Sequence, residues 1–268
     1  MKRNKIKVLL AEVAKNEKVA KDIWQLTLDP GPDSIVTEMS PGQFVCLAPL
    51  SSDSVMARPL SVSMISTSNG TFKILHKVVG KNTLLMSQLP KGQKVKFWGP
   101  LGKSEIINPD HYEEVWLIGG GIGIAPLLFF ERVLSDFQGA TARVFYGNRI
   151  KDEIIKLNLY THKKVEIATE DGSVGYKGLI TDLFAKKVKY RSKEKRLVIT
   201  CGPDRMMQKV AEICQQAKLD CYVILEKVMA CGMGVCLGCS IKTTSGMKKI
   251  CHDGPIFKAE EVIWDELA

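Results

Sequence analysis

Four cysteines in the last forty residues of the chain have the spacing of iron ligands. Cys231, Cys236 and Cys239 form a C-x4-C-x2-C pattern, and Cys251 follows after eleven intervening residues. Thiolates in this order, with a distant fourth, match the plant-type [2Fe–2S] pattern. The three glycines between the first three cysteines permit the tight turns and positive φ values that a loop wrapped around a cluster requires. The segment therefore predicts a [2Fe–2S] site.

Zinc is the competing metal, because structural zinc sites also take four cysteines. Zinc knuckles favour paired C-x2-C units, and only Cys236 and Cys239 form such a pair here. Four unliganded buried thiols are a further alternative. His252 is interpreted as a turn residue, because four thiolates already complete a ligand set. The cysteines outside the ligand spacing in apolar runs are predicted to be buried and inert: Cys46, Cys214 and Cys221.

A second chemical signal is the glycine-rich run GGGIGIAP at Gly119 to Pro126, between an apolar strand pattern and an apolar helix pattern. Backbone amides and a helix N-terminus at such a loop can approach a pyrophosphate. It is not the dinucleotide fingerprint, because the last required glycine falls on Ile124 or Pro126, and a simple tight turn remains the alternative. Cys201-Gly202-Pro203-Asp204 also follows a strand pattern. Two such turns at adjacent strand ends would hold both halves of a nucleotide.

A third signal lies earlier, in Arg58-Pro59-Leu60-Ser61. A guanidinium beside a strand can pair with a diphosphate, and a serine hydroxyl can hydrogen-bond a flavin ring nitrogen. A strand start with a surface arginine is the alternative. The turn Gly80-Lys81-Asn82-Thr83 supports the flavin interpretation, since it can open a short helix that holds the same diphosphate.

The patterns around these residues predict three blocks in a chain of 268 residues that is 45% hydrophobic. Short strand patterns at 23–28, 43–47, 60–65, 71–79 and 94–98 alternate with Pro, Gly and Asp turns up to about Pro100, as in a small antiparallel barrel. Strands and helices then alternate, as in a parallel α/β sheet, and Gly99 to Gly102 are expected to form the linker between the two blocks. The fold class is α+β multidomain: an antiparallel β-barrel (1–101), an α/β nucleotide-binding domain (102–225) and a small iron–sulfur domain (226–268).

The net charge of +9 is scattered in short clusters with little aromatic interleaving, so no nucleic-acid partner is expected. Apolar runs are too short for a signal peptide or a membrane span. A cytoplasmic protein is expected, and there clustered cysteines more often bind metal than form disulfides.

The whole chain resembles the electron-transfer subunit of class B dihydroorotate dehydrogenase, within the ferredoxin-reductase group. The motifs that carry the resemblance are PGQF at 41–44, RPLS at 58–61, GGGIGIAP at 119–126, EDGSVGYKG at 170–178, CGP at 201–203, and EKVMACGMGVCLGC with CHDGPIF. The cysteine segment is the specific part, because the other motifs are shared by ferredoxin reductases generally.

The resemblance implies a barrel that binds FAD, a domain that binds NAD as co-substrate, and a [2Fe–2S] domain. It places Arg58, Pro59, Leu60, Ser61, Gly80 and Thr83 at FAD; Gly120, Gly121 and Gly123 at the nicotinamide nucleotide, with Cys201 and Gly202 near its ring; and Cys231, Cys236, Cys239 and Cys251 on iron. Leu60 is a departure, because many reductases have an aromatic residue there. No side chain is required as a strong acid or base.

The resemblance also implies a partner, the FMN-containing catalytic subunit that oxidises dihydroorotate in pyrimidine biosynthesis, in a heterotetramer of two chains of each kind. Electrons would pass from the partner FMN to the cluster, to FAD and to NAD+. A flavin is needed because it exchanges hydride with a nicotinamide and single electrons with a cluster. One alternative is the small subunit of an NAD(P)H-linked ferredoxin or sulfide oxidoreductase. Another is a redox-sensing or electron-carrier module without nicotinamide turnover. The choice between NAD and NADP stays open, since Arg149 lies just past a strand, where the 2′-phosphate of NADP could reach it.

Overall fold

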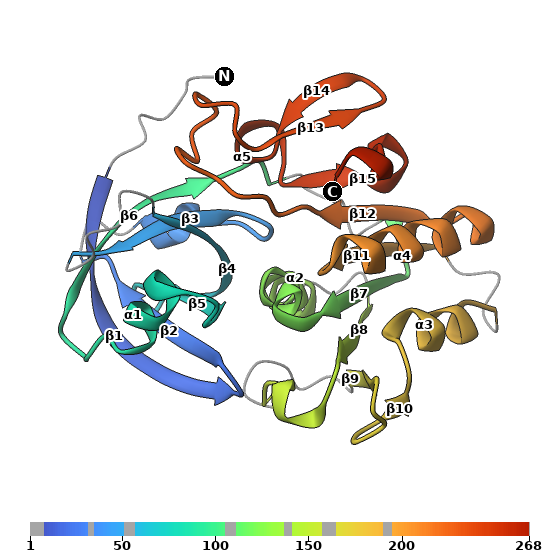
Figure 1. Cartoon of the computed structure of the whole chain (residues 1–268), viewed down its shortest axis with the longest axis horizontal. Helices are drawn as coiled ribbons and strands as arrows, with labels where there is room; N and C mark the ends of the chain where they lie inside the picture. Colours follow the sequence, from blue (N-terminus) through green and yellow to red (C-terminus); the bar gives the residue numbers. More distant parts are fainter. Residues whose placement is uncertain are drawn as a thin grey trace.

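The computed structural model describes residues 8–31, 35–50, 57–104, 111–136, 141–156, 165–189 and 195–267. Within them the chain forms a closed barrel, a seven-stranded sheet and a two-stranded hairpin. Figure 1 shows the barrel on the left, the large sheet on the right and the C-terminal segment above both. No helix in these ranges is long and apolar enough to cross a membrane.

The barrel is antiparallel throughout and closes in the order β1-β2-β5-β4-β3-β6. Its strands are β1 (Val8–Ala20), β2 (Ile23–Asp29), β3 (Phe44–Pro49), β4 (Arg58–Ser66), β5 (Thr71–Lys77) and β6 (Lys94–Leu101). Alternate residues point inward, as a period of two requires, so that Phe72 and Ile74 of β5 are buried in the barrel core. The rings of Phe72 and Phe97 meet there at 5.4 Å.

The seven-stranded sheet has the order β10-β9-β8-β7-β11-β12-β15, parallel except for the edge strand β15. Its strands are β7 (Glu114–Gly120), β8 (Thr141–Asn148), β9 (Val165–Thr169), β10 (Tyr176–Lys177), β11 (Arg196–Cys201), β12 (Asp220–Ile224) and β15 (Ile256–Lys258). From β7 the chain first builds outward through β8 and β9, and then returns to add β11 on the other side. The carboxyl ends of β7 and β11 therefore form the switch point at which α/β sheets bind ligands.

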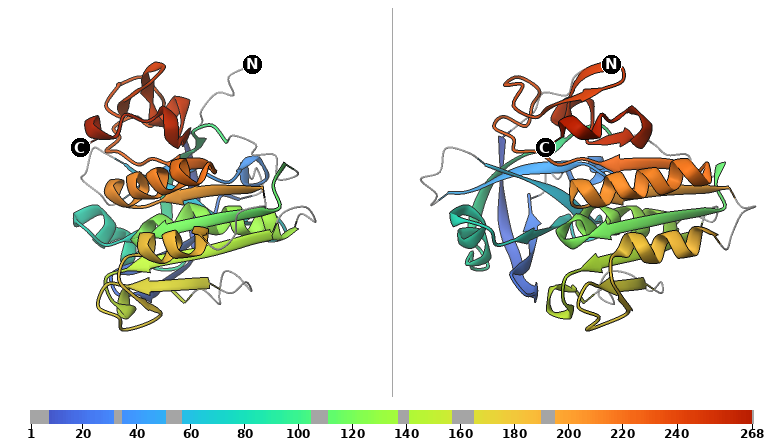
Figure 2. Two further views of the ribbon diagram at one scale, coloured as in Figure 1. Left: turned by 90° about the vertical axis from the view of Figure 1, so that its right-hand side faces the viewer. Right: turned by 45° about the vertical axis from the view of Figure 1, so that its right-hand side comes forward.

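Helices cover both faces of this sheet. The α-helices are α1 (Lys81–Ser87), α2 (Ile124–Asp136), α3 (Ile180–Lys189), α4 (Asp204–Ala217) and α5 (Ile250–Asp253). Short 3-10 helices span Ile35–Glu38, Gly121–Gly123, Lys151–Glu153, Ala259–Glu261 and Trp264–Glu266. Figures 1 and 2 show α2 between the sheet and the barrel, and α3 and α4 on the far face.

The side chains of β7 point alternately to the two faces of the sheet, which explains why helices pack on both faces. Val115 and Leu117 pack in a core with α2, whereas Trp116 and Ile118 pack in the core under α3 and α4. The α2 core also takes in Ile23 of the barrel. The barrel and the sheet therefore share buried apolar surface, which fixes their relative position.

The C-terminal segment rests on both larger units. It contains the hairpin of β13 (Ser240–Thr243) and β14 (Gly246–Lys249), the helix α5 and the edge strand β15. The predicted linker is partly wrong, because Gly99 to Leu101 form the end of β6. The next residues are held by the C-terminal segment: the Lys103 amide donates to the Gly254 carbonyl at 2.6 Å.

The predicted fold class is confirmed: a barrel, a largely parallel sheet and a small C-terminal unit occur in that order. The division at residues 101 and 225 stays a prediction. β15 comes from the third block and pairs with β12 of the second.

Candidate functional site

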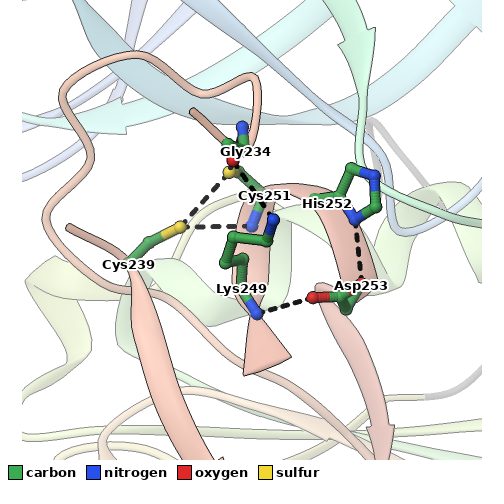
Figure 3. A network of polar contacts seen from close by, with 6 residues as sticks. All are labelled: Gly234, Cys239, Lys249, Cys251, His252 and Asp253. Atoms are coloured by element: carbon green, nitrogen blue, oxygen red, sulfur yellow. Dashed lines mark hydrogen bonds and ion pairs between the residues drawn. The ribbon is translucent and has the colours of Figure 1, made fainter. Parts of the chain in front are cut away.

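The four predicted cluster cysteines lie in one loop and the helix next to it, as two pairs. The Sγ atoms of Cys239 and Cys251 are 3.2 Å apart (Figure 3). Cys231 and Cys236 form the second pair, with a side-chain hydrogen bond between them and the Cys236 amide 3.4 Å from the Cys231 sulfur. Cys239 and Cys251 are buried, whereas Cys236 is exposed.

Backbone amides point at these sulfur atoms, as expected of a loop that holds thiolates. The Met233 amide lies 3.3 Å from Cys231 Sγ, and the Gly234 amide 3.0 Å from Cys251 Sγ. Burial opposes ionisation of Cys231, but the amides of Cys236, Met233 and Val235 outweigh it and lower its pKa to about 6. Burial and the adjacent Cys239 thiol raise the pKa of Cys251 to about 12.

Residues behind the fourth cysteine fix its helix. The Lys249 amide donates to the Asp253 carboxylate at 2.8 Å, and His252 Nδ1 lies 2.8 Å from the other oxygen (Figure 3). The Lys249 ammonium donates to the Gly234 carbonyl at 3.2 Å, which ties α5 to the loop. His252 is thus held by Asp253, consistent with its interpretation as a turn residue.

The arrangement fits a binuclear cluster. In the described residues, no three His, Cys, Asp or Glu side chains are grouped around one point. Two pairs of thiols supply two protein ligands to each iron of a [2Fe–2S] cluster. Cys231, Cys236, Cys239 and Cys251 would hold it.

A cavity of about 280 Å³ lies where β4 of the barrel faces the segment after β12. Pro59 and Ser61 line it, and these alternate residues share one face of the strand. Leu60 points the other way and packs against the barrel core, while Arg58 starts the strand and is half-buried. The predicted RPLS residues are therefore divided between the cavity and the barrel wall.

Gly80 and Thr83 lie at the start of α1 and do not line this cavity. Thr83 Oγ1 accepts from the amides of Val79 and Gly80 at 2.9 and 3.1 Å. A Cβ on Gly80 would meet no atom within 4 Å, so the backbone there is open to an approaching group. An open turn and a Ser-lined cavity are consistent with a flavin whose diphosphate and ring occupy separate places.

Glu226 lines the same cavity as Pro59 and Ser61, and the sequence interpretation missed it. The side chain of Glu226 is exposed, yet desolvation by the protein atoms around its carboxyl group, together with the charge of Asp204, raises its pKa. The Cys201 thiol is close enough for the Glu226 charge to help raise the thiol pKa. A single acidic residue after an apolar strand carries no spacing signal that could have identified it.

A second cavity, of about 440 Å³, opens at the carboxyl ends of β7, β8 and β9. Gly120 and Gly121 line it, as predicted for nucleotide contacts, and Gly121 has a φ of 56°. Cations and carboxylates both contribute to its lining: Lys77, Arg149, Arg205, Lys209, Glu153 and Glu170. Backbone amides at a strand end with cations nearby suit a pyrophosphate.

The remaining predicted residues lie behind this cavity. A Cβ on Gly123 would be 2.5 Å from the Cys201 carbonyl oxygen and 2.6 Å from Gly202 Cα. Cys201 itself is fully buried in the core on the α2 side of the sheet. Gly123 therefore permits the start of α2 to pack on the end of β11, whereas direct nucleotide contact by Gly123, Cys201 and Gly202 stays a prediction.

An ion-pair cluster joins the barrel to this cavity. Glu153 accepts from Arg149 at 2.6 Å and from Lys77 of β5 at 3.3 Å. These two cations hold the pKa of Glu153 down at about 2. The sequence suggested that Arg149 could reach a 2′-phosphate. Arg149 lines the cavity, but its guanidinium donates to Glu153.

Three family models match separate parts of the chain. Residues 226–263 match the iron–sulfur cluster binding domain of dihydroorotate dehydrogenase B. Residues 117–212 match an oxidoreductase NAD-binding domain, and residues 10–106 an oxidoreductase FAD-binding domain. The three cofactor-binding domains inferred from the sequence are confirmed.

Two relatives with the same name match nearly the whole chain. The chain is 33% identical to the dihydroorotate dehydrogenase B (NAD(+)) electron transfer subunit of Clostridium acetobutylicum over 98% of this chain and 100% of that one. The subunit of the same name from Listeria innocua is 34% identical over 94% and 97%.

Among solved structures, the NADH-dependent reduced ferredoxin-NADP oxidoreductase matches with a TM-score of 0.84 and 32% identity, over 95% of this chain and 90% of that chain. Phthalate dioxygenase reductase matches in fold, with a TM-score of 0.64 and 17% identity over 89% and 87%. The near full-length relatives and the match to the cluster-binding domain together show that the chain belongs to the family of dihydroorotate dehydrogenase B electron transfer subunits.

Proposed function

We propose that this protein passes electrons from the FMN of a dihydroorotate dehydrogenase catalytic subunit, through a [2Fe–2S] cluster and FAD, to NAD+. The observation that carries the proposal is the pairing of four thiols next to a barrel and a sheet that each offer a separate cavity. When bound, the flavin would exchange hydride with the nicotinamide and single electrons with the cluster.

The residues of this chain would bind and orient these groups. Cys231, Cys236, Cys239 and Cys251 would ligate iron, and the loop amides would stabilise the ligand sulfurs. Ser61 would hydrogen-bond the flavin ring, and the Arg58 guanidinium, with Gly80 and Thr83 at α1, would hold the diphosphate.

The nicotinamide nucleotide would be held at the carboxyl ends of β7 and β11. Gly120 and Gly121 would approach its pyrophosphate with Gly123 behind them, and Cys201 and Gly202 would lie near the ring. Among the described side chains that line the cavity of Pro59 and Ser61, Glu226 has the one carboxyl group, so it would act there as a hydrogen-bonding group.

The surface around the cluster loop supports a protein partner. Val235 and Leu237, on both sides of the exposed Cys236, are 76% and 61% exposed, and Val228 and Met247 are exposed nearby in the chain. Large apolar side chains gathered at an electron-transfer loop are expected to be covered by another protein. The proposed partner is the FMN-containing catalytic subunit, in an assembly of two chains of each kind.

The first test is an anaerobic visible spectrum of the purified protein, followed by NADH in one cuvette and NADPH in another. Flavin and iron–sulfur bands that bleach with NADH would support the electron path. Cys236→Ser should remove or alter the cluster bands while FAD stays bound; unchanged bands and iron content would contradict the ligand assignment. A colourless protein rich in zinc would contradict the cluster itself.

A second candidate function is the small subunit of an NAD(P)H-linked ferredoxin oxidoreductase, favoured by the 0.84 TM-score to the structure of that kind. Co-purification from the source cell separates the two. A dihydroorotate-oxidising partner supports the first function, and a different flavoenzyme supports the second.

A further inference from the structure

The cluster loop is fixed to the barrel at its first ligand. Trp98 of β6 donates its indole N–H to the Cys231 carbonyl at 3.1 Å, although 133 positions separate them. Figure 1 shows the segment after β12 running above β3 and β6 before it reaches α5. Trp98 is opposite Cys46 in the pairing of β3 with β6, so the two residues form one site on the barrel wall.

Cys46 is a thiol next to the loop that is not a predicted ligand. It is 1% exposed, and a Cβ on Gly232 would lie only 2.6 Å from its sulfur, 3.0 Å from Leu101 Cδ1 and 3.6 Å from Trp98 Nε1. The charges of Cys231 and Cys239 both act on this thiol. The loop therefore passes directly over Cys46, and Gly232, with a φ of 68°, permits that approach.

Strand β3 pairs with β6 on one side and, on the other, with β4, which lines the proposed flavin cavity. Cys46 is opposite Pro59 in the pairing of β3 with β4, and Pro59 lines the cavity with Ser61 and Glu226. Cys46 therefore lies between the cluster loop and a residue of the proposed flavin cavity.

We propose that Trp98 and Cys46, two non-ligand residues of the FAD-binding barrel, position Cys231 and raise the reduction potential of the cluster. The inference rests on the proposed function. Hydrogen bonds, dipoles and solvent exclusion around the sulfurs set the potentials of iron–sulfur clusters. The Trp98 N–H draws negative charge from the Cys231 carbonyl, and the Cys46 thiol fills the space under the loop as a weak donor. Both favour the more negative, reduced state.

The test is an EPR-monitored redox titration of the full chain with its cofactors. Trp98→Phe and Cys46→Ala should each lower the equilibrium constant for one-electron reduction of the cluster about tenfold, a shift of 59 mV. Cys46→Ser, which keeps a donor, should stay near wild type. Cys214→Ala and Trp116→Phe are matched controls, because both residues belong to the core under α3 and α4 and not to the apolar cluster that contains Cys46, Cys239 and Cys251.

The outcomes are distinct. A cluster in the variants with wild-type potential and g values overturns the inference and leaves the proposed function intact. Absence of a cluster in the wild-type chain overturns the proposed function itself. If Trp98→Phe loses iron while FAD remains bound, the positioning role is supported. The comparison of Cys46→Ala with Cys46→Ser then still tests the effect on the reduction potential of the cluster. Equal shifts in Cys46→Ser and Cys46→Ala would show that volume, and not the donor, matters, and would overturn the role given to the thiol.

Discussion

Replacing Gly123 by alanine tests whether the start of α2 packs on the end of β11. The added Cβ would lie 2.5 Å from the Cys201 carbonyl oxygen and 2.6 Å from both the Cys201 carbonyl carbon and Gly202 Cα. These are backbone atoms, so no side-chain rotation relieves the overlap, and the helix and the loop must separate. The φ of Gly123 is not in the left-handed region, so the effect is one of space and not of backbone strain.

The magnitude follows from overpacking, which costs about 2 kcal/mol in a well-packed site. At about 2 to 4 °C per kcal/mol for a chain of this size, Gly123→Ala should lower the melting temperature by about 4 to 8 °C. It should also slow flavin reduction by NADH, because the displaced loop carries Cys201 and Gly202 at the proposed ring site. Far-UV circular dichroism with heating gives the first quantity, and stopped-flow absorbance the second.

Gly70→Ala is the matched control. Gly70 has a φ of 63° and nothing within 4 Å of an added Cβ, so alanine there adds about 1 kcal/mol of backbone strain without a clash. It lies in a barrel turn away from both proposed cofactor cavities, so the rate of reduction by NADH should not change. If Gly123→Ala melts no lower than Gly70→Ala and is reduced at the wild-type rate, the packing argument is refuted.

Three other substitutions have defined outcomes. Glu226→Gln should slow flavin reduction by NADH with FAD retained, and should shift the pH dependence of that step, since desolvation by neighbouring protein atoms and the charge of Asp204 raise the Glu226 pKa; an unchanged pH profile would argue against a role at the flavin. Arg58→Ala should lose FAD during gel filtration, and full retention would make Arg58 a surface residue. Glu153→Gln should cost about 2 kcal/mol at neutral pH. Because the Glu153 pKa is depressed, that contribution is present above about 4.5 and is lost as pH falls towards about 2; a thermal-stability difference that instead varied above this window would identify another titrating group.

Local patterns accounted for most of the strands. Alternation predicts β2, β4 and β5, and the apolar runs before glycines predict β7 and β11, because each depends on residues close in sequence. β1 was not predicted. Its polar residues, among them Lys15 and Glu17, interrupt the apolar pattern, and pairing with β2 and β6 stabilises the strand instead.

The candidate site divides in the same way. The cysteine spacing predicts the loop because all but one of the ligands lie within nine residues, and the glycine turns predict Gly120 and Gly121 at a strand end. Gly123 carries the same local signal, yet the structure shows that it makes room for a neighbouring strand, which a one-dimensional pattern cannot distinguish from room for a phosphate.

Residues that depend on how domains meet had no local signal at all. In the sequence, nothing distinguishes Cys46 from other buried thiols, or Trp98 from other aromatic residues in strands. Closure of the barrel brings β3 and β6 together, and only the return of the chain after β12 lays Gly232 on them. A cofactor that must exchange single electrons needs its neighbour close and rigidly held, and a loop with three glycines is not rigid alone. The barrel wall supplies that rigidity, so the residues that fix the loop necessarily lie far from its ligands in sequence.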